Sequence, residues 1–296
     1  MMRRHLAVLA VGLFAIAAKA DGLEGIWNPA FWNPTELKNS CGLDFVSLTV
    51  GGDVRSAYLS RAKVCEARPM SAQYATADIP FDRIAPVGRL GVDFWTISSL
   101  THKMDDAHKN MFFHERDFTL RYGYDWQIAD DWRLASDVMR TWVNLPGYKH
   151  GADHSTHEWR FAQRLDNPWI TPYYLLRRAV HPRDWLYVRV GAQHAFHLTD
   201  TLSLTPNFYA EFGNENHYRQ RYGENDPPWS KYRGGAQALN AVLTLSWKVT
   251  EWSSLFVSVQ QFGIVDDDAR DRTKAKKTHN SRRDITVGAV GVACRF

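Results

Sequence analysis

The chain ends on the stretch ITVGAVGVACRF, residues 285–296, and the interpretation of the whole sequence starts from this segment. Counting back in steps of two from the last residue gives one face without charge: Phe296, Cys294, Val292, Val290 and Gly288. A period of two is that of a pleated strand. Because the protein as a whole is polar, with a mean hydropathy of -0.40, this apolar face must lie against either a protein core or lipid.

The same alternation recurs from about residue 48 onward. It is clearest at 118–125, 202–212 and 239–248, where one face is apolar throughout and the other is polar. Less regular segments bring the total to about twelve predicted strands: 47–60, 70–81, 88–101, 131–144, 155–165, 169–180, 185–198, 252–265 and 284–296. Most match the ~9–11 residues that a tilted strand needs to cross a bilayer.

The connections between these strands alternate in length. Four are short turns, at 128–131, 165–168, 198–201 and 248–252. Others are long and polar, at 101–110, 145–155, 213–235 and 266–281, whereas 181–184 is a short exception on that side. Short periplasmic turns and long extracellular loops are typical of outer-membrane barrels.

The N-terminus predicts export. Residues 1–20 combine arginines, an apolar run and a small-residue end, as in a secretory signal peptide. Loss of Arg3, Arg4 and Lys19 would lower the formal charge from +4 to about +1, which gives no basic field for nucleic acid. Residues 21–44 are then a periplasmic extension, and 45–296 form the barrel. The extension repeats Trp-Asn-Pro, which suits either a small plug or a flexible leader.

Alternation by itself also fits a secreted β-sandwich or a lipocalin-like barrel. The two faces favour an all-β transmembrane up-and-down barrel, with a charged lumen and aromatics at the strand ends. The predicted pore-lining residues are Asp53, Arg55, Asp93, Arg121, Asp125, Arg133, Asp137, Glu158, Arg160, Arg164, Arg189 and Glu211. The predicted interfacial aromatics are Tyr58, Trp126, Trp132, Trp142, Trp159, Trp169, Trp185 and Trp247.

On these residues, the last strand and its terminal Phe296 resemble the end of Gram-negative outer-membrane β-barrel proteins. The resemblance implies an outer-membrane location among lipid and lipopolysaccharide, and recognition of Phe296 by the barrel-assembly machinery. The early stretch SLTVGGDVRSAYLSR, followed by hairpins, is similar to small porins of about twelve strands. This second likeness brings no functional residues with it.

Three functions fit such a barrel. The first is passive diffusion of small hydrophilic solutes through a narrow lumen. Five arginines on neighbouring strands could form an anion-favouring wall, or Asp125, Asp137 and Glu158 could neutralise them as a salt-bridge ladder. We favour the ladder. The five arginines are Arg121, Arg133, Arg160, Arg164 and Arg189.

The second function is a lipid hydrolase or deacylase. It is suggested by segment 150–158, where a serine lies beside histidines and carboxylates. These residue types can perform nucleophilic attack or bind a metal ion. That cluster comprises His150, Asp153, His154, Ser155, His157 and Glu158. The third is a non-conducting barrel that binds lipopolysaccharide or a partner through the charged segment 266–277. We expect no cofactor and no metal, because phosphate loops, paired CxxC motifs and a GxSxG elbow are absent.

The three cysteines leave at least one thiol unpaired in a monomer. Cys41 and Cys65 are expected at opposite ends of a strand, too far apart for a disulfide. Cys41 lies nearer Cys294 in the expected strand order, which leaves a bond between these two open.

Overall fold

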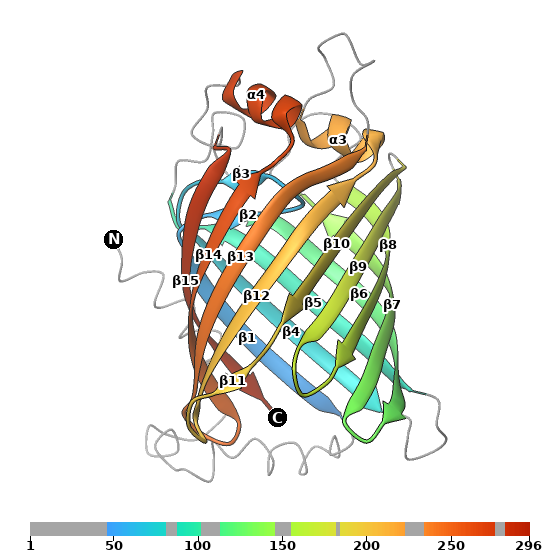
Figure 1. The fold of residues 1–296 in the computed structure, drawn as a ribbon, viewed down its shortest axis with the longest axis vertical. Coiled ribbons are helices and arrows are strands. Elements are labelled where there is room, and N and C mark those ends of the chain that lie inside the picture. Colours follow the sequence, from blue (N-terminus) through green and yellow to red (C-terminus); the bar gives the residue numbers. More distant parts are fainter. Residues whose placement is uncertain are drawn as a thin grey trace, which may run out of the picture. The chain divides into compact units, whose positions relative to one another are not determined.

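A computed structural model describes residues 46–80, 88–101, 113–145, 155–181, 184–222, 234–275 and 282–296. Twelve antiparallel strands form a closed ring in the order β1, β4 to β10, β12 to β15, closed by the pairings β10–β12 and β1–β15 (Figure 1). The strands are β1 (Ser47–Arg55), β4 (Met70–Pro80), β5 (Arg89–Ser99), β6 (Phe113–Ala129), β7 (Trp132–Asn144), β8 (Ser155–Asp166), β9 (Thr171–His181), β10 (Trp185–Gln193), β12 (Leu202–Gly213), β13 (Gly235–Lys248), β14 (Ser253–Ile264) and β15 (Asp284–Arg295). The predicted fold class is confirmed.

The C-terminal strand that opened the interpretation closes the ring. β15 pairs with β14 on one side and with β1 on the other, from Thr49 opposite Arg295 to Arg55 opposite Ala289. The seam is glycine-rich because the chains approach closely there: a Cβ on Gly291 would collide with the carbonyl oxygen of Gly52. Pairing of the first strand with the last leaves no open sheet edge, which a membrane interior requires.

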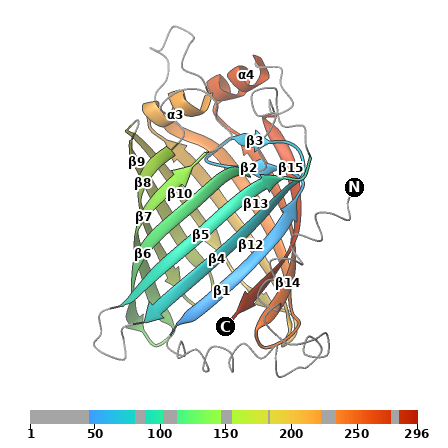
Figure 2. The same cartoon turned by 180° about the vertical axis from the view of Figure 1, so that it is seen from behind.

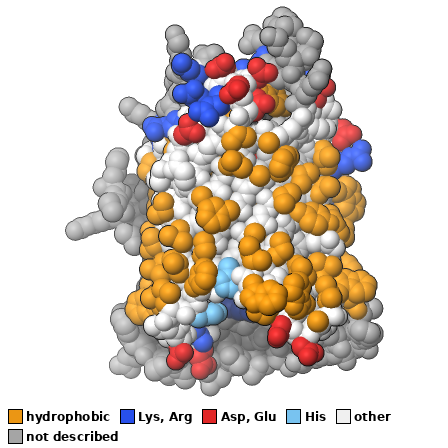
Figure 3. Space-filling view, in the orientation of Figure 1, with side chains coloured by type: hydrophobic (Ala, Val, Ile, Leu, Met, Phe, Trp, Pro, Cys, Tyr) orange, Lys and Arg blue, Asp and Glu red, His pale blue; other side chains and the backbone are white. Residues whose placement is uncertain are grey.

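The apolar residues of the strands point outward. Leu120 and Val257, for example, keep 45% and 53% of their surface exposed, although both lie in the middle of long strands. Groups of hydrophobic side chains are spread over the outside of the barrel, between the charged side chains toward its two ends (Figure 3). A soluble protein does not expose an apolar band of this extent, because water would drive it to associate. The apolar face therefore contacts lipid, and the protein is a bacterial outer-membrane barrel rather than a secreted sandwich.

The two ends of the barrel differ. Short turns join β6 to β7, β8 to β9 and β13 to β14 at one end, the periplasmic end of such barrels. At the opposite, extracellular end lie α3 (Glu215–Tyr222) and α4 (Asp267–Ala275), so the polar segment 266–277 is partly helical. β11 (Phe196–His197) extends the line of β10 along β12. No helix among the described residues is long and apolar enough to cross a membrane.

The first extracellular connection differs from the prediction. A strand over 47–60 was expected, but β1 ends at Arg55, and the chain then forms a separate hairpin of β2 (Tyr58–Leu59) and β3 (Val64–Glu66). Its turn residues Arg61 and Ala62 have φ values of 51° and 62°. Left-handed conformations at non-glycine residues cost of order 1–3 kcal/mol each and persist only where the surroundings hold them. Figure 2 shows this hairpin within the extracellular part of the barrel.

Candidate functional site: the barrel lumen

One side of the β2–β3 hairpin binds charged groups of the barrel wall. The guanidinium of Arg61 lies 3.2 Å from Glu115 on β6 and 3.5 Å from Glu158 on β8. It also stacks over the ring of Trp185 on β10, with 5.5 Å to the ring centroid. The Tyr58 hydroxyl donates a hydrogen bond to Glu115 at 2.6 Å. Burial, assisted by the Glu115 carboxylate, raises the pKa of Tyr58, so the phenol remains a donor.

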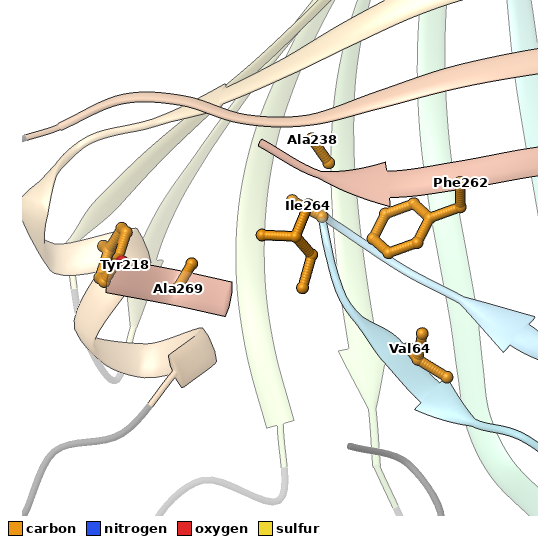
Figure 4. Packing of buried hydrophobic residues seen from close by; sticks show 7 residues of the cluster. Val64, Tyr218, Ala238, Phe262, Ile264 and Ala269 are labelled. Atoms are coloured by element: carbon orange, nitrogen blue, oxygen red, sulfur yellow. The ribbon is translucent and has the colours of Figure 1, made fainter. Parts of the chain in front are cut away.

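The other side of the hairpin packs on apolar residues. Ala62 and Val64 belong to one buried cluster with residues of β13, β14 and the two extracellular helices (Figure 4). The other members are Tyr218, Ala238, Phe262, Ile264 and Ala269. Because β8 and β14 are five positions apart in a ring of twelve strands, the hairpin reaches across the lumen from one wall to the opposite one.

Around the Arg61 end of the hairpin the lumen is closely packed. Glu158 has 0% of its side chain exposed and is surrounded by three arginines: Arg61, Arg160 at 3.0 Å and Arg177 at 2.6 Å. Arg160 continues the network to Asp117, 2.9 Å away. Buried ions are tolerated only when each is paired and hydrogen-bonded, and the network's three carboxylates, Glu115, Asp117 and Glu158, match its three arginines in number.

A second buried network joins β10, β12, β13 and β14. Glu211 accepts hydrogen bonds from Tyr187, from Arg189 at 3.1 Å and from Asn240 at 3.0 Å. Gln260 donates to Asn240 at 2.7 Å. Polar groups therefore line this wall of the lumen as well, each with a partner in the neighbouring strand.

Nearer the periplasmic end the charged groups keep contact with water. Arg121 bridges Asp78 at 2.9 Å, Asp93 at 3.1 Å and Asp137 at 3.7 Å. Arg133 pairs with Asp166 at 2.8 Å. The exposed side-chain fraction is 46% for Arg133 and 27% for Asp93, against 5% for Arg61 and 0% for Glu158. Arg121 and Arg160 are alike, at 13% and 15%. This part of the lumen is lined by hydrated ion pairs.

The predicted pore-lining residues lie on the face opposite the exposed apolar residues, and the structure brings them together in pairs. Each of the five arginines considered for a basic wall has a carboxylate within 4 Å, which is the ladder arrangement. The remaining pair is Arg55 with Asp53. Their partners in the lumen were not predicted: Arg61, Asp78, Arg89, Glu115, Asp117, Asp166, Arg177 and Tyr187. Extending the count by twos from Arg121 back to Glu115 finds some of them, whereas no strand pattern signals Arg61.

The predicted interfacial aromatics divide into two groups. Trp126, Trp159, Trp169 and Trp247 are exposed on the outside, and Trp132 and Trp142 are partly exposed. The prediction is wrong for Tyr58 and Trp185, which are buried inside the barrel. Both lie where the hairpin meets the wall. Trp185 is four residues from Arg189 on β10 and therefore shares its face, so counting by twos from Arg189 places Trp185 inside.

The described residues of the cluster considered for a hydrolase do not form a catalytic arrangement. Ser155 and His157 share the outward face of β8, whereas Glu158 points inward into the arginine network. His150, Asp153 and His154 lie outside the described residues. Within the described ranges no three histidine, cysteine, aspartate or glutamate side chains gather as a metal site. Cys294 carries a free thiol, and Cys41 lies outside the described residues.

No protein-family profile and no curated protein matches the chain. Among solved structures, the NanC porin is 9% identical, with 84% of this chain and 98% of that chain covered and a TM-score of 0.46. The KdgM porin is 10% identical, with 84% and 99% covered and a TM-score of 0.43. Outer membrane phospholipase A from Escherichia coli is 12% identical, with 83% and 89% covered and a TM-score of 0.45.

Proposed function

We propose that the protein is a narrow outer-membrane channel for passive diffusion of small hydrophilic solutes. The observation that carries the proposal is the hydrated ladder of ion pairs in the periplasmic half of the lumen. Twelve strands enclose more space than the eight whose side chains just fill a barrel. Charged side chains that stay partly exposed inside such a ring favour a water-filled path.

The extracellular half sets the width of this path. The hairpin of β2 and β3 reaches across the lumen and is held at both walls. Inward-folded segments of this kind select solutes by size. We therefore expect a low conductance and a small exclusion limit, with passage alongside the hairpin or during its displacement.

The charge of the periplasmic half favours weak ion selectivity. Its ion pairs comprise four arginines (89, 121, 133 and 164) and five aspartates (78, 93, 125, 137 and 166), which sum formally to -1. Paired charges of both signs leave little net field to attract one kind of ion. The arginines are thus proposed to hold the wall rather than to attract anions.

Conductance is the direct test. The refolded barrel is inserted into planar bilayers, and the same preparation is placed in liposomes for swelling assays with sugars of increasing size. Small single-channel steps, and swelling that stops at small solutes, would support the channel. A folded barrel that neither conducts nor swells liposomes contradicts it and returns the non-conducting surface barrel as the better hypothesis.

Three further roles are proposed for the two ends of the chain. Residues 1–20 would direct export, residues 21–44 would extend into the periplasm, and Phe296 would be recognised by the barrel-assembly machinery. Removal of Phe296 should lower the amount of folded barrel in outer-membrane fractions, while the refolded protein keeps its conductance.

A further inference from the structure

The outward face of β6 to β9 carries a set of arginines near the extracellular end. Of the charged residues in the described spanning strands, only Arg116, Arg140, Arg178 and Asp284 share the outward face with the apolar residues. Three of these four are arginines, on β6, β7 and β9. A charge on the lipid face is tolerated near an interface and disfavoured at the bilayer centre. These arginines therefore lie at headgroup depth.

The cross-strand register aligns two of the arginines with a tryptophan. Arg140 is directly opposite Trp159, and Trp159 is directly opposite Arg178, so the three form one row across β7, β8 and β9. We call Arg140, Trp159 and Arg178 the outer arginine row. With neighbouring strands ~4.8 Å apart, the two arginine backbones are about 10 Å from each other, and both side chains can reach a group placed over Trp159.

Arg140 is positioned by aromatic rings rather than by a carboxylate. Its guanidinium carbon lies 5.1 Å from the ring centroid of Trp159 and 5.9 Å from that of Trp142. Among the described residues it has one hydrogen-bond contact, with Nδ1 of His157 at 3.4 Å. In the described part of the chain no carboxylate lies within 4 Å of Arg140. Stacking uses the face of the guanidinium, which leaves edge N–H groups able to bind an oxyanion.

Arg178 has an acidic partner that an anion can replace. It forms an ion pair with Asp184 at 3.0 Å, and both side chains are more than half exposed. Exposed pairs of this kind are weak. A phosphate over Trp159 could therefore draw the Arg178 side chain toward itself and away from Asp184.

We propose that the outer arginine row binds a phosphate group carried by a lipid headgroup of the outer leaflet. Charge complementarity supports an anion, since arginines match phosphate oxygens through paired N–H donors. A lipid is the source because the next row toward the bilayer is apolar, with Val138, Phe161 and Leu176 opposite one another, and would contact acyl chains. The proposal does not depend on whether the barrel conducts.

Native mass spectrometry of the refolded barrel tests this directly. The barrel is titrated with diphosphorylated lipid A and, separately, with its dephosphorylated form. We expect the phosphorylated form to bind more tightly, and Arg140→Gln to weaken its binding roughly tenfold, as expected for loss of a charge-assisted hydrogen bond. Asp184→Asn should strengthen binding a few-fold, because Arg178 is then released. Arg219→Gln, which removes an arginine of α3 paired with Glu215, is the matched control and should change nothing.

The outcomes are separable. Equal binding of the two lipid forms, or unchanged binding in Arg140→Gln, overturns the proposal. Displacement of the lipid by millimolar inorganic phosphate would show that free phosphate, not a lipid, is the ligand. Heat-modifiable migration on gels establishes that each variant is folded; if Arg140→Gln does not fold, Arg178→Gln is used in its place with the same expectation.

Discussion

The two halves of the lumen solve the same problem in opposite ways. Both contain arginines and carboxylates that cannot face lipid. In the periplasmic half water solvates them, as the exposure of Arg133 shows. Loss of one such pair should therefore have little effect on the stability of the barrel. In the extracellular half the hairpin covers Glu158, which has no exposed side-chain surface and pairs with three arginines. One inserted hairpin therefore changes what the same kind of ion pair does. In the periplasmic half the pairs line the lumen, whereas in the extracellular half they hold the β2–β3 hairpin in place.

The largest expected effect, on conductance, comes from removing the β2–β3 hairpin, which makes the two halves of the lumen different. Replacing Ala57–Ala67 by a four-residue glycine–serine turn should join β1 to β4 directly, because these strands are neighbours. The extracellular half would then fill with water, and single-channel conductance should rise several-fold. Unchanged conductance in a folded variant would show that the hairpin does not restrict the path.

A stability measurement compares the ion pairs themselves. Glu158→Gln leaves the surrounding arginines without their common carboxylate, and loss of one partner of a buried pair costs about 3–5 kcal/mol. Asp166→Asn, in the hydrated half, should cost about 1 kcal/mol or less. Urea unfolding of vesicle-inserted protein, followed by tryptophan fluorescence, gives both values. Equal losses would mean that the two halves are equally hydrated.

Loss of the Arg61 contacts that hold the hairpin should change conductance less than deletion of the whole hairpin. Arg61→Met keeps an unbranched side chain but removes the guanidinium and its contacts with Glu115, Glu158 and the Trp185 ring. The apolar contacts of Ala62 and Val64 remain, so the hairpin should stay in the lumen while moving more often. We expect brief, larger openings in single-channel records, absent from an Arg164→Met control. A quiet trace identical to that of the wild type would assign the anchoring to the apolar side alone.

The smallest expected effect concerns selectivity. Because the periplasmic half is nearly neutral, the wild-type reversal potential in a salt gradient should lie close to zero. The double variant Arg121→Gln, Arg133→Gln should shift it by several millivolts toward cation preference, because the formal charge of these pairs falls from -1 to -3. A clear anion preference of the wild type would contradict the ladder interpretation and restore the basic wall.

The sequence alone determined the barrel, its orientation and its two faces. A period of two repeated over about twelve segments, an apolar C-terminal strand and alternating connection lengths are local properties, and each survives into the structure. The parity rule also assigned Arg121 and Glu158 to the inside, because a strand gives its side chains only two directions.

Tertiary structure alone decided what fills the lumen. Tyr58 lies in the segment 47–60 that the sequence assigns to a strand, and Arg61 directly follows it. The burial of both depends on the walls contributed by β6, β8, β10 and β14, up to about two hundred residues away. The direction of Trp185 follows from the strand period, since it shares the face of Arg189, whereas its contact with Arg61 is decided by that insertion. Local alternation reports which side of a sheet a residue occupies, whereas the contents of a closed space follow from which distant segments meet inside it.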